Sequence, residues 1–96
     1  MTLMKNPSHP GEVLSELYIG PLDMSAIALA KRLHVPRTRI ERLVKGETAL
    51  TVDTAIRLAK FFRTTPEYWM NLQRAWDLAQ ARDMIDVSDI TPFEAA

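Results

Sequence analysis

Residues 25–46 read SAIALAKRLHVPRTRIERLVKG, and this stretch decides the fold. Ser25 is a good N-cap, and the apolar residues after it recur at helical spacing as far as Leu33. Pro36 suits the first turn of a second helix, and Gly46 suits its end. The pattern therefore predicts two short helices joined by a tight turn of about three residues.

The second of these helices has one apolar face and one polar face. Two helices joined so closely must cross steeply, which leaves the outer side of the second one exposed. At 100° per residue, Ile40, Leu43 and Val44 share the inner face. The outward face and the helix start carry polar, mostly cationic residues, which are Arg37, Thr38, Arg39, Glu41, Arg42 and Lys45. Arg can pair with a guanine edge, Glu can accept from cytosine and Lys binds phosphate, so this face suits the DNA major groove.

Charge is distributed unevenly along the chain. The formal net charge is zero, but Ser25 to Arg63 holds nine basic and three acidic residues, a net charge of +6. The rest of the chain holds three basic and nine acidic residues, a net charge of −6. A local field of +6 attracts polyanions, of which nucleic acid is the commonest. The alternative is a solvated helical surface, with ion pairs such as Glu41 to Lys45 along the helix.

Three further helices are expected around this pair, and no strand pattern is visible. They should cover about residues 10–19, 52–62 and 65–82. The sequence predicts an all-α fold of five helices, a single helix-turn-helix domain over residues 1–96 with the motif at about 25–45. Residues 83–96 should form an acidic, weakly structured tail.

Helical spacing also predicts which side chains are buried. The expected inward-facing residues are Val13, Leu14, Leu17, Tyr18, Ile27, Leu29, Ala30, Leu33, Ala55, Ile56, Leu58, Ala59, Phe62, Trp69, Leu72 and Trp76. The last three form a stripe along the fifth helix that is too large to leave in water.

Composition argues against an enzyme or a metalloprotein. There is no Cys and only 3 Gly, so thiolate metal sites, disulfides and a glycine-rich phosphate loop are excluded. His9 and His34 lie 25 positions apart with no ligand spacing around them, and we interpret them as a helix-start and a turn residue. We expect no cofactor, no metal and no catalytic residue. No apolar run approaches the roughly 20 residues of a membrane span, so a cytoplasmic protein is expected.

The chain resembles the λ-repressor-like, XRE-type helix-turn-helix family through Leu29-Ala30, Leu33, Val35, Ile40 and Gly46. It resembles the HigA/VapI-type antitoxin branch of that family more closely. The stretches that carry this likeness are HPGE at 9–12, VPRTRI at 35–40, TAIRLA at 54–59 and TPEYWMNLQ at 65–73. The resemblance covers roughly residues 7–80.

This resemblance implies a homodimeric DNA-binding protein that represses its own operon and neutralises a HigB-like toxin, a ribosome-dependent mRNA endonuclease encoded beside it. Its partners would be double-stranded operator DNA, the toxin and a second copy of the chain. The residues that would read bases are Arg37, Thr38, Glu41 and Arg42. Lys45 and Thr48 fall where phosphate or flanking contacts are made, and Arg39 lies beside them.

A repressor without a toxin partner is the alternative. DNA binding and toxin binding use different surfaces, and the helix-turn-helix motif indicates DNA binding alone. The acidic charge outside the motif favours a basic protein partner. Trp69 and Trp76 could also serve such a partner, although tryptophans more often close a core or a homodimer face.

Three positions depart from the family pattern. Ala26 stands where many members have a Gln that contacts phosphate, which predicts a weaker clamp on DNA. His34 replaces the usual turn glycine, and Arg63 replaces the glycine after the paired aromatic residues. The sequence therefore predicts slight strain in the turn and a changed exit from the fourth helix.

Overall fold

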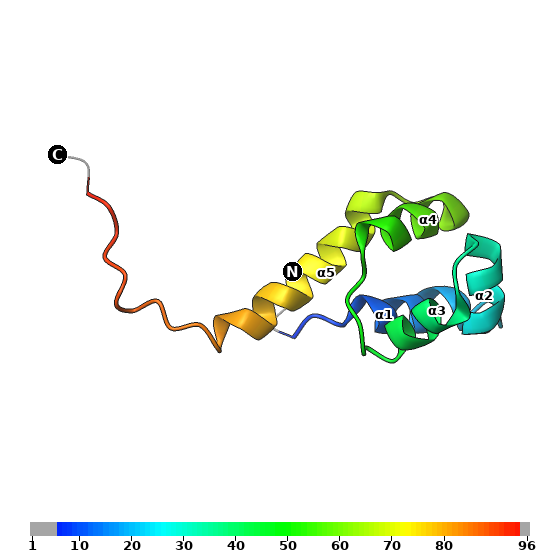
Figure 1. Ribbon diagram of the computed structural model, residues 1–96, viewed down its shortest axis with the longest axis horizontal. Coiled ribbons are helices and arrows are strands. Elements are labelled where there is room, and N and C mark those ends of the chain that lie inside the picture. The colour runs from blue at the N-terminus through cyan, green and yellow to red at the C-terminus, as the bar shows by residue number, and fades with distance from the viewer. Residues whose placement is uncertain (1–5, 95–96) are drawn as a thin grey trace.

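The part of the chain that the structure describes, residues 6–94 of a computed structural model, folds into helices connected by short turns (Figure 1). In order these are α1 (Pro10–Val13), the π-helix η1 (Leu14–Ile19), α2 (Ala26–Leu33), α3 (Arg37–Val44), α4 (Val52–Phe62) and α5 (Pro66–Arg82). The predicted all-α, five-helix fold is confirmed, with α1 and η1 together forming the first predicted helix. The first five and last two residues of the predicted domain and tail lie outside the described residues.

Side-chain caps fix where three of the helices begin. The hydroxyl oxygens of Ser25, Thr51 and Thr65 each accept a hydrogen bond from a backbone N–H three residues later. The distances are 3.0, 3.3 and 3.1 Å, respectively. Such caps satisfy donors that have no partner inside the helix, which explains why these boundaries could be predicted.

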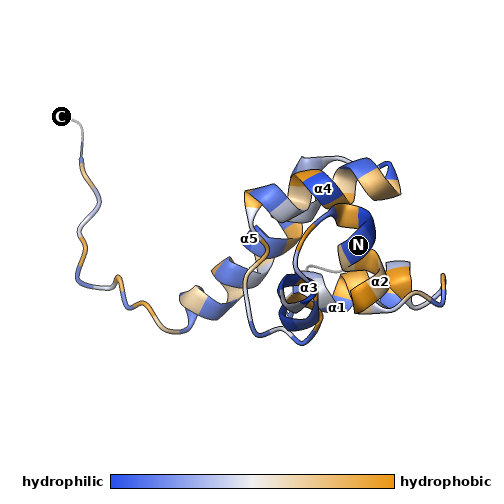
Figure 2. Ribbon diagram, turned by 45° about the vertical axis from the view of Figure 1, so that its right-hand side comes forward, coloured by the Kyte–Doolittle hydropathy of each residue, from blue (hydrophilic) through white to orange (hydrophobic). Residues whose placement is uncertain are grey.

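The core lies between η1, α2, α3, α4 and α5 and is closed by Trp69. This side chain is fully buried, and its Nε1 donates a hydrogen bond of 2.7 Å to the Thr64 hydroxyl. The buried apolar residues are Leu14, Ile19, Leu29, Ala30, Leu33, Ile40, Leu43, Leu50, Ala55, Leu58, Ala59 and Trp69. Figure 2 shows α2 as mainly hydrophobic and α3 as mainly hydrophilic, so α3 contributes little to the core beyond Ile40 and Leu43.

Three residues that were expected to be buried are exposed. Leu17 is 66% exposed, Ile27 38% and Ile56 53%. Leu17 lies in η1, where the Gly20 N–H bonds to the Ser15 carbonyl at 2.8 Å, five residues back. A π-turn changes the angle between successive side chains, so a wheel drawn for an α-helix misplaces Leu17. Ile27 and Ile56 lie away from the buried faces of α2 and α4, which are formed by Leu29, Ala30 and Leu33 and by Thr54, Ala55, Leu58 and Ala59.

His34 and Arg63 adopt the left-handed conformation that glycine would take. Their φ angles are 60° and 59°, and each ends a helix as its C-cap. The Val35 N–H bonds to the Ala30 carbonyl and the Thr64 N–H to the Ala59 carbonyl, each at 3.0 Å. These are the bonds of a glycine-type helix end. The predicted change in the exit from α4 is therefore wrong, and both replacements keep the glycine geometry.

Replacing Arg63 with glycine is expected to raise the free energy of unfolding by about 0.5–1 kcal/mol, because a side chain with φ near +60° is strained whereas glycine is not. Arg63→Ala is the matched control, since it removes the guanidinium but keeps the Cβ. Urea unfolding of both variants measures the difference. An Arg63→Gly protein no more stable than Arg63→Ala would contradict the assignment of strain.

Candidate nucleic-acid interface

The turn between α2 and α3 sets the direction of the candidate recognition helix. Ser25 caps the start of α2, and His34 ends it with a reversal of the backbone. Pro36, with extended backbone angles, is the N-cap of α3. Three residues therefore separate the two helices, as the sequence predicted, and α2 and α3 pack against each other.

The exposed face of α3 is the one predicted from the helical wheel. Ile40 and Leu43 are buried, and Val44 is half-buried. The outward residues Arg37, Thr38, Arg39, Arg42 and Lys45 are exposed, and Glu41 is half-buried. A helix with this distribution can approach the edges of base pairs without uncovering the core.

Four of the seven predicted site residues surround one shallow hollow. Thr38, Arg39 and Arg42 line it from α3, and Thr48 lines it from the loop between α3 and α4. Lys45 lines a second hollow, which also includes Glu12 and Glu16. Arg37 and Glu41 line neither of these. The structure thus brings three α3 side chains together with Thr48 of the loop and sets Lys45 apart at the end of the helix.

Gln73 holds the loop that carries Thr48. Its side-chain oxygen accepts a hydrogen bond of 2.7 Å from the Leu50 backbone N–H, and its amide group donates one of 2.8 Å to Asp77. Gln73 and Leu50 are both buried. Because the two residues are 23 positions apart, the sequence gives no indication of this contact. Thr48 therefore lies in a loop that is anchored to α5 through Leu50.

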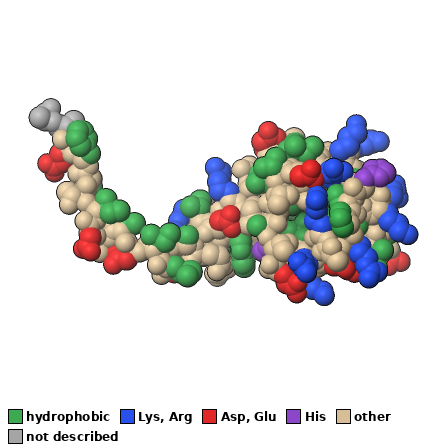
Figure 3. Space-filling view, viewed as in Figure 1, with side chains coloured by type: hydrophobic (Ala, Val, Ile, Leu, Met, Phe, Trp, Pro, Cys, Tyr) green, Lys and Arg blue, Asp and Glu red, His purple; other side chains and the backbone are tan. Residues whose placement is uncertain are grey.

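Basic side chains gather at the end of the molecule formed by α2, α3 and α4, while acidic side chains follow the C-terminal segment (Figure 3). This distribution matches the opposite charges of the two parts of the sequence. The positive end includes the outward face of α3, so a polyanion would be attracted to that face.

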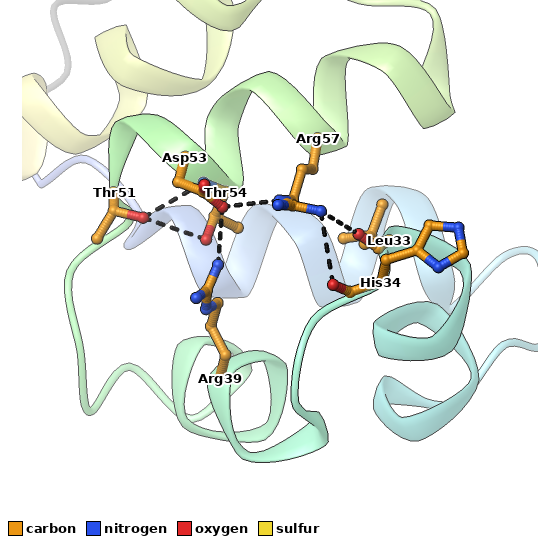
Figure 4. Close-up of polar contacts among 7 residues, drawn as sticks. All are labelled: Leu33, His34, Arg39, Thr51, Asp53, Thr54 and Arg57. Atoms are coloured by element: carbon orange, nitrogen blue, oxygen red, sulfur yellow. Dashed lines mark hydrogen bonds and ion pairs between the residues drawn. The ribbon is translucent and has the colours of Figure 1, made fainter.

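Asp53 links α3, α4 and the turn between α2 and α3 (Figure 4). Its Oδ1 accepts from Arg57 Nε at 2.7 Å and from Arg39 Nη1 at 2.8 Å. Arg57 in turn donates to the Leu33 carbonyl at 2.8 Å and, more weakly, to the His34 carbonyl at 3.5 Å. Sequence reasoning missed this network, although the spacing of Asp53 and Arg57 is that of a helical ion pair. The network orients Arg39 toward α4.

Acid is expected to weaken this link. The guanidinium of Arg57, with that of Arg39, holds the pKa of Asp53 below its usual range. A group whose pKa is lower in the folded chain adds stability above its unfolded pKa, and that stability is lost as the pH falls below about 4. Asp53→Asn should therefore be less stable than the parent chain at pH 7, and the difference should shrink toward pH 3. Urea midpoints at both pH values measure this, and a difference independent of pH would contradict the ion-pair role.

Metal binding and membrane insertion have no support in the described residues. Residues 6–94 hold no cluster of three or more His, Cys, Asp or Glu side chains able to bind a metal ion. Over the same residues, every helix is too short or too polar to cross a bilayer.

Comparison with known proteins agrees with this geometry. Residues 15–69 match the helix-turn-helix family. Virulence-associated protein I of Dichelobacter nodosus is 44% identical over 86 residues, which cover 88% of this chain and 80% of that protein. The chain belongs to the XRE-type helix-turn-helix family, in its HigA/VapI branch. Members of this family are DNA-binding regulators and antitoxins rather than enzymes.

Two solved structures of this branch are similar along most of the chain. A HigA-family addiction module antidote protein from Coxiella burnetii is 45% identical, with a TM-score of 0.79 over 91% of this chain and 98% of that one. The Pseudomonas aeruginosa antitoxin HigA, solved with the higBA promoter, is 37% identical, with a TM-score of 0.80 over 82% of this chain and 86% of that one. The predicted family is therefore confirmed, and one of its HigA/VapI-type members has been solved with promoter DNA.

Proposed function

We propose that this XRE-type chain is the DNA-binding antitoxin of a type II toxin-antitoxin pair. It would repress its own operon by binding the operator as a homodimer, and neutralise a HigB-like mRNA endonuclease, both in the cytoplasm. The observation that carries the proposal is the outward face of α3, which is polar, mostly cationic and exposed on a helix-turn-helix of the HigA/VapI branch.

The position of each outward residue along α3 and the following loop suggests which part of the DNA it would contact. Arg37 and Thr38, in the first turn of α3, and Arg42, in its last turn, would contact base edges, and Glu41 would accept from cytosine. Lys45 ends the helix and would bind phosphate. The two remaining contacts, Thr48 and Arg39, lie at the flank. Arg39 would use the guanidinium N–H groups that Asp53 leaves free.

A dimer is proposed because one such module offers a small interface. Single modules bury roughly 600–1,000 Å² of protein surface on DNA, whereas two modules on half-sites about 34 Å apart bind tightly and specifically. A symmetric operator would follow from a two-fold dimer.

Two observations support toxin binding. Similar proteins are a HigA antitoxin and a HigA-family antidote protein, and positive and negative charges lie in different parts of this chain. The negative charge outside residues 25–63 would attract a basic ribonuclease, while the positive end stays available for DNA. A repressor without a toxin partner keeps every DNA contact described above, so the two functions require separate tests.

Co-expression with the neighbouring open reading frame tests the antitoxin function. The proposal expects growth arrest from the neighbour alone, rescue by this chain, and co-elution of both proteins from an affinity tag. The variant with Arg37, Arg42 and Lys45 replaced by Ala should lose operator binding and still rescue growth. A non-toxic, unbound neighbour would leave only the repressor, and a folded triple variant that no longer rescues growth would contradict separate surfaces.

A further inference from the structure

The surface of η1 and of the turn that follows it exposes apolar side chains that a regular helix would bury. Leu17 is 66% exposed, and Leu22, in the turn, is 57% exposed. In a regular α-helix, Leu17 would share the inward face of Leu14, three residues earlier. In η1 the next buried residue after Leu14 is instead Ile19, five residues later. The π-turn therefore places Ile19 in the core and leaves Leu17 in solvent.

Gly20 allows this π-turn to close. Its N–H donates to the Ser15 carbonyl at 2.8 Å, and a Cβ on Gly20 would lie 2.7 Å from the same oxygen. Because that oxygen belongs to the backbone, no side-chain movement could make room for the Cβ. π-turns are rare and occur frequently at functional sites. The exposure of Leu17 is thus set by the backbone of η1, which indicates a surface that serves contact with another molecule.

The same segment carries uncompensated negative charge. Residues 6–24 contain three acidic side chains, Glu12, Glu16 and Asp23, and no basic one, a net charge of −3. All three are exposed, and none of them lies in an ion pair within the described part of the chain. Over α5, by contrast, two acidic and two basic residues cancel. On the helical body of the molecule, the negative charge is therefore concentrated around η1.

This charge selects the kind of partner. DNA phosphates would be repelled by three unpaired carboxylates, so the η1 surface does not extend the DNA-binding face of α3. A symmetric contact with a second copy would place the same carboxylates against each other, which is unfavourable. A protein with a basic surface would gain from both features, because its cations could pair with the carboxylates and its apolar side chains could cover the leucines.

We propose that residues 16–23 form the centre of the surface on which a basic protein partner docks. Leu17 and Leu22 would make the apolar contacts, and Glu16 and Asp23 would pair with basic side chains around them. This inference deepens the proposed antitoxin function and rests on it, because the basic ribonuclease of that function is the partner. The outward face of α3 stays available for DNA.

Two double variants of the full chain test the proposal against the purified product of the neighbouring open reading frame, with binding rates measured by biolayer interferometry. Leu17→Ser/Leu22→Ser removes the apolar contacts and should speed dissociation about tenfold or more. Glu16→Lys/Asp23→Asn changes the charge by +2 and +1, and should slow association about tenfold or more at low salt, because it removes electrostatic steering. Asn is chosen at position 23 because it tolerates the left-handed φ of 54° there.

The matched controls make the same kinds of change elsewhere. Val52→Ser/Ile56→Ser removes two apolar side chains of α4 that are 60% and 53% exposed. Glu47→Lys/Asp89→Asn makes the same change in charge at two exposed positions. Both controls should bind the neighbouring protein at rates within about twofold of those of the parent chain.

Operator affinity reports whether the test variants are folded, and Leu17→Ser/Leu22→Ser should bind operator DNA like the parent chain. Test variants that bind the neighbouring protein like the parent, or controls that lose binding to the same extent, would overturn the η1 surface and leave the antitoxin function in place. A neighbouring protein that does not bind the parent chain would overturn that function, and this inference with it.

Discussion

Replacing Gly11 with alanine should lower the free energy of unfolding by about 3 kcal/mol, one of the largest effects of any single substitution in this chain. A Cβ on Gly11 would lie 1.7 Å from the Leu43 carbonyl oxygen and 3.0 Å from the Val44 Cα. Both are backbone atoms, so no side-chain rotation relieves the overlap. Instead α1 must move away from the last turn of α3, which carries Arg42. Urea unfolding measures the stability loss, and operator affinity should fall with it.

Gly46→Ala is the matched control for this substitution. Its Cβ would have its nearest neighbour, in His9, at 3.9 Å, but its φ of +74° disfavours any side chain. The expected cost is therefore conformational, about 1 kcal/mol. Equal losses in the two variants would show that Gly11 is not required for the close approach of α1 to α3.

Arg42→Ala is expected to weaken operator binding by about 1–3 kcal/mol and to relax base preference, because the exposed guanidinium can pair with a guanine edge. Lys45→Ala should weaken binding to operator and unrelated DNA alike, and reduce the slope of log K against log salt by about 1. Fluorescence anisotropy against both DNAs over a salt series separates the two roles. An Arg42→Ala variant that loses specific and non-specific affinity equally would contradict base reading.

The fold was largely predictable because its boundaries are local. Ser25, Thr51 and Thr65 cap helices through contacts within three residues. Pro10 and Pro36 mark two further helix starts, and Gly20 and Gly46 follow the ends of η1 and α3. Leu17 was misplaced because η1 departs from the α-helical period, a feature that apolar spacing does not reveal. The close approach at Gly11 depends on backbone packing between distant segments, so only the family likeness pointed to that glycine.

The sequence predicts the outward-facing residues of the candidate site but not the hydrogen bonds and ion pairs that hold them in place. Apolar spacing identified the face that holds Arg42 and Lys45, because the buried side of a helix determines the exposed side. The anchoring of the Thr48 loop by Gln73 and the orientation of Arg39 by Asp53 come from contacts between elements that are far apart in the sequence. Such contacts have no periodic signature, and only the folded structure reveals them.

The central claim is that the outward face of α3 reads the sequence of operator DNA. The most direct test measures the affinity of the chain for the DNA upstream of its own gene and for a shuffled duplex of the same length, both at about 150 mM salt. We predict at least 10³-fold tighter binding to the upstream DNA, in line with specific recognition by helix-turn-helix proteins. The Arg37, Arg42 and Lys45 triple alanine variant should lose this preference. Equal affinity of the parent chain for both duplexes would contradict the assignment of the α3 face as a sequence-reading surface.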